Sequence, residues 1–249
     1  MSAVVALAEH AAPGPDAEAP RTLVERAYRA LRQDIIRGHL RPGERLRVEH
    51  LKDVYGVGAG TLREALALLL SDALVTAEGQ RGYRVSPISL NDLRDLTDTR
   101  VMLETEALRQ SIRRGDAAWE QRLAAAFDAL SHAERAGRDM DPVLWEGFNK
   151  RFHEVLISAH DSEWTHHLLG VLYRHGERYR QVAIRMGAAR FFERDVHAEH
   201  EAIYKAALAR QEARAALALE AHIRLTCDVL TRHAAENSGP SALTGQAQS

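Results

Sequence analysis

The sequence has a single cysteine, Cys227, among its 249 residues. No intrachain disulfide can form, which suits a protein of a reducing compartment such as the cytoplasm. The sequence also has no apolar run near the roughly 20 residues that a membrane-spanning helix needs. Its first ten residues hold no Lys or Arg, so they lack the charged start of a secretory signal. We therefore expect a cytoplasmic protein that does not associate with membranes.

The small net charge of −2 conceals a segregation of charge along the chain. Residues 21–87 carry 12 Lys and Arg against 8 Asp and Glu, a net charge of +4, whereas residues 88–249 carry 21 against 24, a net charge of −3. A basic module followed by an acidic remainder is expected where only the first part contacts nucleic acid. Residues 1–20 and 236–249 are rich in small and polar residues, which predicts disordered tails.

The segment from Leu51 to Val85 has the element order of a winged helix-turn-helix. A helix ends at Tyr55, a turn with two glycines follows, and a second helix begins near Ala59 with apolar residues at helical spacing. Two β-prone runs then flank a polar turn at residues 78–82. In such a domain the start of the second helix enters the major groove of DNA, and the hairpin tip lies beside it.

Several polar residues lie where this arrangement would meet double-stranded DNA. Arg63 lies one turn into the second helix, and arginine can bridge a guanine edge or bind a phosphate. The small residues before it allow the backbone to approach closely and to donate N–H groups to a phosphate. The alternative is that Arg63 forms a surface ion pair with Glu49 or Glu64. The predicted DNA-binding residues are Arg45, Arg47, His50, Lys52, Gly60, Thr61, Arg63, Arg81 and Gly82.

From a capping box at Ser89 to about residue 235 the pattern is helical throughout. Stop and start signals predict six or seven helices with short connections, an antiparallel all-α bundle. The fold class is therefore mostly α, with a winged helix-turn-helix domain at residues 21–87 and a helical domain for effector binding and dimerisation at 88–235. Boundaries between helices are predicted at Gly115-Asp116, Gly137 to Pro142, His160 to Ser162, His175-Gly176, Met186-Gly187 and Arg210-Gln211.

The sequence holds 13 histidines, and three of them lie among core-facing residues of predicted bundle helices. His153 follows Asn149 by one helical turn, so the two share a face, while His200 and His222 lie in later helices. If the three converge, they form a site for zinc, nickel or another first-row metal. For each of them the alternative is a core histidine, and His197 competes with His200 because the two are one turn apart.

Arg100 lies in the first bundle helix on a face that is otherwise apolar, with Glu104 one turn later. A surface ion pair between these two residues is the alternative, and such a pair contributes little stability. Tyr179 and Arg185 lie in a later helix and offer further donors for an anionic ligand.

The segments IIRGHLRPGERL, LKDVYGVGAGTLREALALLLSDALV and RGYRVSPIS resemble the DNA-binding domain of GntR-family bacterial transcription regulators. The next segment, LRDLTDTRVMLETEALRQSI, is similar to the first helix of the FCD effector domain of the FadR-like subfamily. The resemblance covers about residues 22–233. The usual turn of the subfamily is close to VSRTPVREAL, and this chain reads VGAGTLREAL, with Ala59 in place of an arginine. Operators of better-known members therefore do not carry over to this chain.

This resemblance implies a DNA-binding regulator, a repressor by expectation, that binds a palindromic operator as a homodimer. Many FCD domains hold a divalent metal, and the matching residues here are Asn149, His153, His200 and His222. The resemblance implies zinc as the metal, with nickel or manganese as alternatives, and a neutral Asn149 where the family often has Asp.

The same resemblance implies a small carboxylate effector that binds near the metal. In FCD domains the arginine that matches Arg100 pairs with an effector carboxylate, a contact well suited to a guanidinium. Asn149, Tyr179 and Arg185 complete the predicted effector site. The stretches PISLNDLRDLT and MLETEALRQSI look like those of regulators of glutarate utilisation, which implies glutarate or a related dicarboxylate or hydroxy acid.

A helical metal-dependent enzyme with an accessory DNA-binding-like module is the alternative function. An enzyme of that kind needs an open metal position and a general base near it. The sequence has no HExxH motif and no constellation of paired carboxylates. We therefore expect a regulator and not an enzyme.

Overall fold

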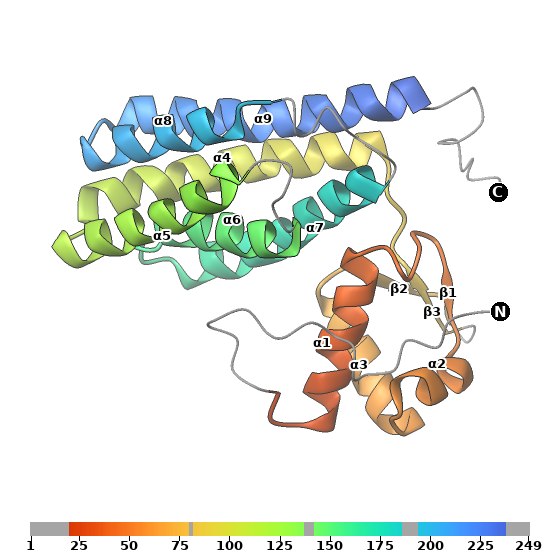
Figure 1. The fold of residues 1–249 in the computed structure, drawn as a ribbon. Coiled ribbons are helices and arrows are strands. Elements are labelled where there is room, and N and C mark those ends of the chain that lie inside the picture. Colours follow the sequence, from red (N-terminus) through yellow and green to blue (C-terminus); the bar gives the residue numbers. More distant parts are fainter. Residues whose placement is uncertain (1–19, 80–81, 137–141, 186–193, 238–249) are drawn as a thin grey trace. The chain divides into compact units, whose positions relative to one another are not determined.

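The structure, a computed structural model, describes residues 20–79, 82–136, 142–185 and 194–237, without the side chains of 142–143, 182–185 and 233–237. The described residues form nine helices and one small sheet (Figure 1), which confirms the predicted fold class. The predicted tails at residues 1–20 and 236–249 lie almost wholly outside the described residues.

The chain folds into two compact units. It passes from the first unit to the second between Ile88 and Ser89, and residues Glu177–Val182 group with the first unit.

The first unit contains three helices and a three-stranded antiparallel sheet of strand order β1-β3-β2. Leu46 and Ala77 both pair with Tyr83 of the central strand. The hairpin of β2 and β3 is the predicted one, whereas β1 is an additional strand, because two residues are too few for an alternating pattern to show. The elements are α1 (Leu23–Ile36), β1 (Arg45–Leu46), α2 (Val48–Tyr55), α3 (Ala59–Ser71), β2 (Val75–Ala77) and β3 (Tyr83–Val85).

The turn between α2 and α3 depends on one glycine. Gly56 ends α2 with a φ of 60°, a left-handed conformation that glycine adopts without the steric cost of a Cβ. Its N–H donates to the carbonyl of Lys52, and so does the N–H of Val57 at 3.1 Å. These bonds satisfy the last turn of α2 and direct the chain into α3.

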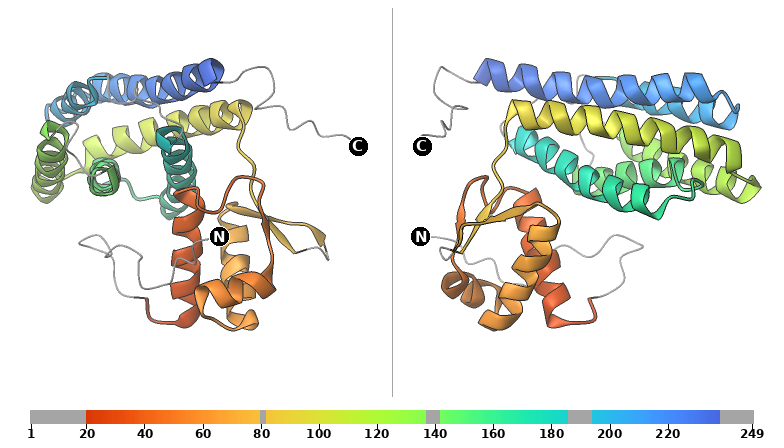
Figure 2. Two further views of the ribbon diagram at one scale, coloured as in Figure 1. Left: turned by 45° about the vertical axis from the view of Figure 1, so that its right-hand side comes forward. Right: turned by 180° about the vertical axis from the view of Figure 1, so that it is seen from behind.

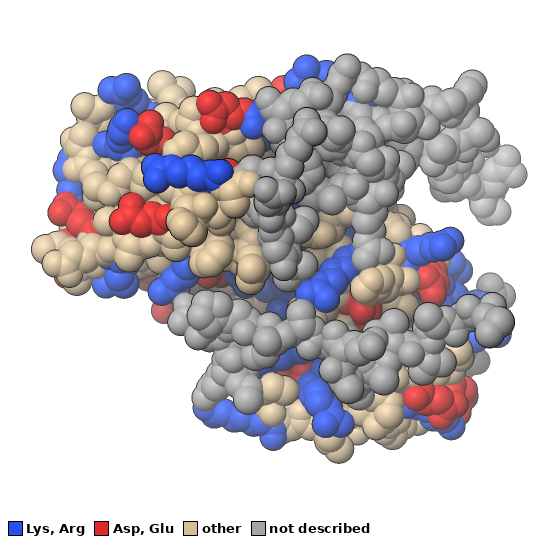
Figure 3. Space-filling model, in the orientation of Figure 1, with Lys and Arg blue, Asp and Glu red and all other residues tan. Residues whose placement is uncertain are grey.

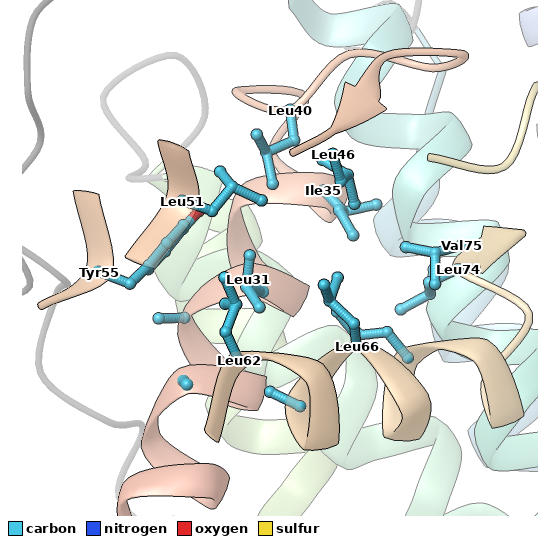
Figure 4. Packing of buried hydrophobic residues seen from close by; sticks show 14 of the residues in the cluster. Leu31, Ile35, Leu40, Leu46, Leu51, Tyr55, Leu62, Leu66, Leu74 and Val75 are labelled. Carbon is cyan, nitrogen blue, oxygen red and sulfur yellow. The ribbon is translucent and has the colours of Figure 1, made fainter. Parts of the chain in front are cut away.

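The core of the first unit lies between α1, α3 and the sheet (Figure 4). Leu31 and Ile35 of α1 pack with Leu62 and Leu66 of α3, and all four side chains are fully buried. Each such leucine or isoleucine contributes roughly 1.5–3 kcal/mol by leaving water. Because this stripe of α3 faces the core, the positions between its members, Arg63 among them, face solvent.

The second unit is a helical bundle, and its six helices fall within the predicted six or seven. α4 packs along α9, α8 packs against α9, and α5 packs against both α6 and α8 (Figure 2). No helix in the described part of the chain is long and apolar enough to cross a membrane. The helices are α4 (Leu90–Arg114), α5 (Ala117–Arg135), α6 (Pro142–Leu156), α7 (Glu163–Arg185), α8 (Val196–Leu208) and α9 (Glu212–Asn237).

Side-chain caps start several bundle helices where the sequence predicts them. The Ser89 hydroxyl accepts the N–H of Asp92 at 3.1 Å, and the Asp116 carboxylate accepts the N–H of Trp119 at 2.8 Å. Ser162 likewise accepts the N–H of Thr165 at 3.2 Å. Each cap satisfies a helix N–H that has no partner within the helix, so these boundaries are encoded locally.

The boundary predicted at His175-Gly176 is wrong, because α7 continues through both residues to Arg185. A glycine inside a helix costs about 1 kcal/mol relative to alanine. Gly176 is buried, as is Tyr173 one turn before it, so packing outweighs that local cost.

Candidate functional site

The start of α3 is open for contact with another molecule. Its N-cap is Gly58, which has no side chain to accept the N–H groups of the first turn. A Cβ added at Gly58 or at Gly60 would meet no atom within 4 Å, so neither glycine is required by packing inside the chain. The free N–H groups and the open space suit the approach of a phosphate at the N-terminus of the helix.

Three predicted DNA-binding residues, Arg47, His50 and Arg63, are exposed and form no ion pair among the described residues. Glu49 pairs instead with Lys52, whose Nζ lies 2.7 Å from Oε2 of Glu49. This hydrogen bond from Lys52 is the main cause that lowers the pKa of Glu49, and the charge of Arg63 adds a smaller part. The alternative of a surface ion pair of Arg63 is therefore not found. Gly60 is exposed, and Thr61 is half-buried beside it.

A carboxylate organises the base of the wing. Glu78 accepts a hydrogen bond from Nε of Arg84 at 2.6 Å and lies 3.4 Å from Nη2 of Arg45. The bond from Arg84 is the main cause that lowers the pKa of Glu78, while burial opposes it. Arg45 is therefore partly neutralised within the chain. Gly82 has a φ of +94°, and Arg81 lies outside the described residues.

The described surface of the bundle has a different character on the face drawn in Figure 3. There, Lys and Arg side chains alternate with Asp and Glu. This mixture offers no extended field of one sign to a nucleic acid.

Three histidines converge in the interior of the bundle. His153 of α6, His200 of α8 and His222 of α9 are all buried, and each offers a ligand atom within 4.8 Å of the others. The ring centroids of His200 and His222 are 4.6 Å apart, and that of His153 lies 5.6 and 5.2 Å from them. The structure thus brings together the three histidines that the sequence singled out.

Asn149 lies one turn before His153, and its orientation is determined by its neighbours. Its Nδ2 donates to the hydroxyl of Tyr173 at 2.9 Å, and that hydroxyl donates to Glu146 at 3.0 Å. Oδ1 of Asn149 is buried without a hydrogen-bond partner in the described part of the chain, and so is Nε2 of His200. Buried polar atoms of this kind are rare unless a ligand satisfies them.

The competition between His197 and His200 is resolved by a carboxylate of α5. Oε1 of Glu134 lies 2.7 Å from Nδ1 of His200, and Oε2 lies 3.1 Å from Nδ1 of His197. His200 is fully buried and belongs to the cluster, whereas the ring of His197 stacks on Phe127 with centroids 6.1 Å apart. The two histidines share Glu134, and only His200 joins the other two.

His222 has a similar carboxylate behind it. Its Nδ1 lies 2.9 Å from Oε2 of Glu199 and 3.2 Å from Nη2 of Arg194. Arg194 pairs with Glu199 through both Nε and Nη2, and it also donates to the carbonyl of His222 at 2.8 Å. The Nδ1 of His222 therefore has a carboxylate and a guanidinium within reach.

Arg100 is buried, and so is its partner Glu104, which corrects the alternative of a surface pair. Nε of Arg100 donates to Oε1 of Glu104 at 2.7 Å, and this is its one hydrogen bond among the described residues. The guanidinium lies 5.7 Å from the ring centroid of Tyr173, whose hydroxyl contacts Asn149. Arg100 and the histidine cluster are thus connected through Tyr173.

The remaining predicted effector residues stay predictions. Tyr179 is buried in the part of α7 that groups with the first unit, and the side chain of Arg185 lies outside the described residues.

Sequence reasoning missed Glu134, Tyr173 and Glu199. Glu199 adjoins His200 in the chain, but Glu134 is 66 residues away from it, and no local signal connects the two. Helix packing alone places them together.

The donor set fits a divalent first-row metal. Three imidazoles and a carboxamide oxygen surround one point, two of their atoms are buried without partners, and carboxylates lie behind two of the rings. In a tetrahedral zinc site neighbouring ligand atoms lie roughly 3.4 Å apart. The separations here, within 4.8 Å, therefore close by small side-chain rotations.

Comparison with known families identifies both units. Residues 23–85 match the family described as bacterial regulatory proteins, gntR family, and residues 95–225 match the FCD domain. The second match covers the four residues of the candidate metal site, and the first covers α3 and the wing.

Similar full-length proteins are regulators. The HTH-type transcriptional regulator BphR of Paraburkholderia xenovorans (strain LB400) is 45% identical over 213 residues, which are 84% of this chain and 86% of the relative. The HTH-type transcriptional repressor GlaR of Escherichia coli (strain K12) is 32% identical over 214 residues, which are 84% of this chain and 96% of the relative. Neither is named as an enzyme, which confirms that expectation.

Solved structures share the fold. McbR/YncC of E. coli superposes with a TM-score of 0.70 at 17% identity, covering 85% of this chain and 98% of the other. A putative GntR regulator of Rhodococcus sp. RHA1 does so with a TM-score of 0.66 at 26% identity, covering 84% and 97%. The chain therefore belongs to the GntR family of bacterial regulatory proteins, in the FadR-like subfamily with an FCD domain, and is a DNA-binding transcriptional regulator.

Proposed function

We propose that this regulator is a repressor whose operator binding is controlled by a small carboxylate, bound beside a divalent metal in the helical domain. The observation that carries this proposal is the convergence of His153, His200 and His222 within the bundle. A buried cluster of polar rings is costly unless it is satisfied, and a metal ion satisfies it. The name of GlaR, a repressor, supports the direction of regulation.

Asn149 through Oδ1 and the three histidines are the proposed metal ligands. Imidazole and carboxamide oxygen suit zinc first, and nickel or manganese are the alternatives. A bound divalent ion supplies a concentrated positive charge that attracts a carboxylate. Because all four ligands are neutral, they leave that charge uncompensated within the first set of contacts.

Arg100 is the proposed partner of the effector. Its Nε is occupied by Glu104, so its two terminal nitrogens remain to form a fork around a carboxylate. Tyr173 lies between this fork and Asn149, which fits a ligand that reaches from Arg100 towards the metal. Glutarate or a related dicarboxylate or hydroxy acid has a matching charge, and Tyr179 and Arg185 are proposed for its second carboxylate.

The DNA-binding domain is proposed to span residues 21–87, and the effector-binding and dimerisation domain residues 88–235. Within the first, we assign operator contacts to the residues predicted from the sequence, with Arg63 as the base-reading side chain. A homodimer on a two-fold operator doubles the small contact area of one reading head. The proposed place of action is the cytoplasm.

Metal binding is tested with protein stripped by a chelator. Zinc, nickel or manganese is then added to wild-type protein, to His200→Ala and to the matched control His197→Ala, and thermal unfolding is followed. We expect added metal to raise the Tm of wild type and His197→Ala but not of His200→Ala, because ligand binding stabilises the folded state. An equal rise in all three proteins, or no rise in any, contradicts the metal site.

Effector binding is tested by titration calorimetry with glutarate and 2-hydroxyglutarate on metal-loaded protein. We expect micromolar binding that Arg100→Ala weakens at least tenfold, about 1.4 kcal/mol. Arg109→Ala is the matched control, because Arg109 lies on the same helix and is exposed. Unchanged affinity in Arg100→Ala, or a bound carboxylate that leaves operator affinity unchanged in a gel-shift assay, contradicts the proposal.

A further inference from the structure

Two buried carboxylates lie behind the histidine cluster, and neither contacts the point where the ligand atoms converge. Glu134 comes from the last turn of α5 and Glu199 from the first turn of α8. The side chain of Glu134 is 5% exposed, and that of Glu199 is 19% exposed. Burial of a carboxylate is costly unless strong partners offset it, so the position of these two groups calls for a reason.

The reason lies in the two nitrogens of an imidazole. A neutral ring carries one N–H, and the nitrogen that carries it cannot bind a metal. A carboxylate 2.7 Å from Nδ1 of His200 accepts an N–H there, which leaves the lone pair on Nε2. Nε2 of His200 is the buried atom that has no partner among the described residues. The carboxylate of Glu134 therefore selects the form of His200 that is ready to bind an ion.

Glu199 stands in the same relation to His222, with an added complication. Its Oε2 lies 2.9 Å from Nδ1 of His222, but the guanidinium of Arg194 lies 3.2 Å from that same nitrogen. A guanidinium can only donate, so a bond from Arg194 to Nδ1 would place the proton on Nε2 and abolish metal binding. Glu199 binds Arg194 through two nitrogens and so keeps it from acting on His222.

We propose that Glu134 and Glu199 are positioning residues of the metal site, each of which holds Nδ1–H of one histidine and turns its Nε2 towards the ion. The inference rests on the metal site of the proposed function. The two carboxylates also place negative charge close to an ion whose proposed ligands, Asn149 among them, are all neutral. This charge partly offsets the cost of burying a divalent cation.

The first test compares metal affinity in variants of equal shape. Glu134→Gln and Glu199→Gln keep the side-chain volume but lose the charge, and an amide can either donate or accept, so it no longer selects one ring form. Competition titrations with zinc alone and a chromophoric chelator are expected to show affinity lowered by roughly 10- to 100-fold in each variant.

Matched controls separate this effect from loss of charge in general. Glu120→Gln removes a carboxylate of the same helix as Glu134 that pairs with Arg210 at the surface. Glu201→Gln removes a carboxylate of the same helix as Glu199 that pairs with Lys205. Both controls are expected to bind zinc as wild type does. If either control loses as much affinity as its matched variant, the carboxylates act through overall charge and the proposal is overturned.

A double variant tests the role given to Arg194. In Glu199→Gln the guanidinium is released beside His222, so we expect Arg194→Met in that background to restore part of the lost zinc affinity. Glu134→Gln has no such neighbour, and Arg194→Met added to it should restore nothing. Equal behaviour of the two double variants contradicts the selective action of Glu199.

The ring form itself can be read in metal-free protein by long-range proton–nitrogen NMR correlations of the imidazoles. Wild type is expected to show Nδ1–H on His200 and His222, and each Gln variant a mixture at its own histidine. An unchanged form in both variants overturns the inference even if zinc binds to wild type. If wild type binds no zinc yet shows these forms, the proposed metal site fails while the positioning of the rings stands.

Discussion

At the scale of single residues, Arg63 shows how position and freedom from partners together define a function. It lies one turn into α3, is exposed, and has no ion pair in the described part of the chain. In a DNA-binding regulator of the GntR family, such a side chain is available to the operator.

We expect Arg63→Ala to weaken operator binding by roughly 1–3 kcal/mol and to relax the preference at one operator position. Its stability should stay near that of wild type, because the side chain has no ion pair to lose. Binding is measured by gel shift on the operator and on single-base variants. Arg214→Ala, an exposed arginine of α9, is the control and should bind normally. An equal loss on every DNA sequence would reassign Arg63 to a phosphate contact.

Asn149→Asp tests the neutral ligand. The Tyr173 hydroxyl has one proton, which it gives to Glu146, and it accepts from Nδ2 of Asn149. A carboxylate at position 149 has no N–H to donate, so two acceptors would compete for that proton. We expect lower stability without metal, tighter zinc binding, and weaker binding of a carboxylate effector, because the added negative charge favours the ion and repels the effector.

These three quantities are measured by thermal unfolding, chelator competition and calorimetry on the same preparations. Asn149→Ala is the matched control, since it removes the ligand atom without adding charge, and it should weaken zinc binding. Tighter effector binding in Asn149→Asp than in wild type would contradict the argument from charge.

At the scale of elements, two glycines near helix ends have opposite relations to their surroundings. A Cβ on Gly60 at the start of α3 meets nothing within 4 Å. A Cβ on Gly115, between α4 and α5, would lie 2.6 Å from Cδ2 of Trp119 and 2.7 Å from the carbonyl of Ser111. Trp119 is fully buried, and its Nε1 donates to the carbonyl of Val155, so it cannot move aside cheaply.

We expect Gly115→Ala to destabilise the helical unit by about 1–3 kcal/mol through overpacking. Gly60→Ala should leave stability unchanged or raise it by up to about 1 kcal/mol, because alanine favours a helix over glycine. Urea unfolding compares the two variants, which carry the same chemical change. If Gly60→Ala nevertheless weakens operator binding, the backbone of α3 approaches DNA closely at this point. Equal stability of the two variants would contradict the steric argument at Gly115.

Element boundaries also mark how far local sequence reaches. The caps Thr22, Ser89 and Asp116 each accept an N–H three residues later, so a few neighbouring residues encode the start of a helix. Gly176 carries a local stop signal as well, yet α7 continues because packing against other helices outweighs it.

At the scale of the whole molecule, one chain presents one reading head, and a two-fold operator needs two. We expect a homodimer in solution, measured by light scattering against the chain mass of 27.7 kDa. The physical reason is that a single small domain gives limited contact with DNA. A mass near that of one chain at micromolar concentration, with operator binding intact, would contradict this expectation.

The sequence by itself determined what depends on neighbours in the chain. Helical periodicity, caps and turn glycines predicted the winged helix-turn-helix and the helical bundle, and family resemblance selected Asn149, His153, His200 and His222. These signals are readable because their hydrogen bonds and apolar stripes join residues a few positions apart.

Only the tertiary structure decided what depends on the packing of distant helices. It placed three histidines of α6, α8 and α9 within reach of one another, separated His200 from His197, and buried Arg100 with Glu104 away from the surface. Glu134 lies 66 residues before His200, and no periodicity within either helix records that distance. Each helix encodes its own buried face, but the partner of that face emerges when the whole bundle packs.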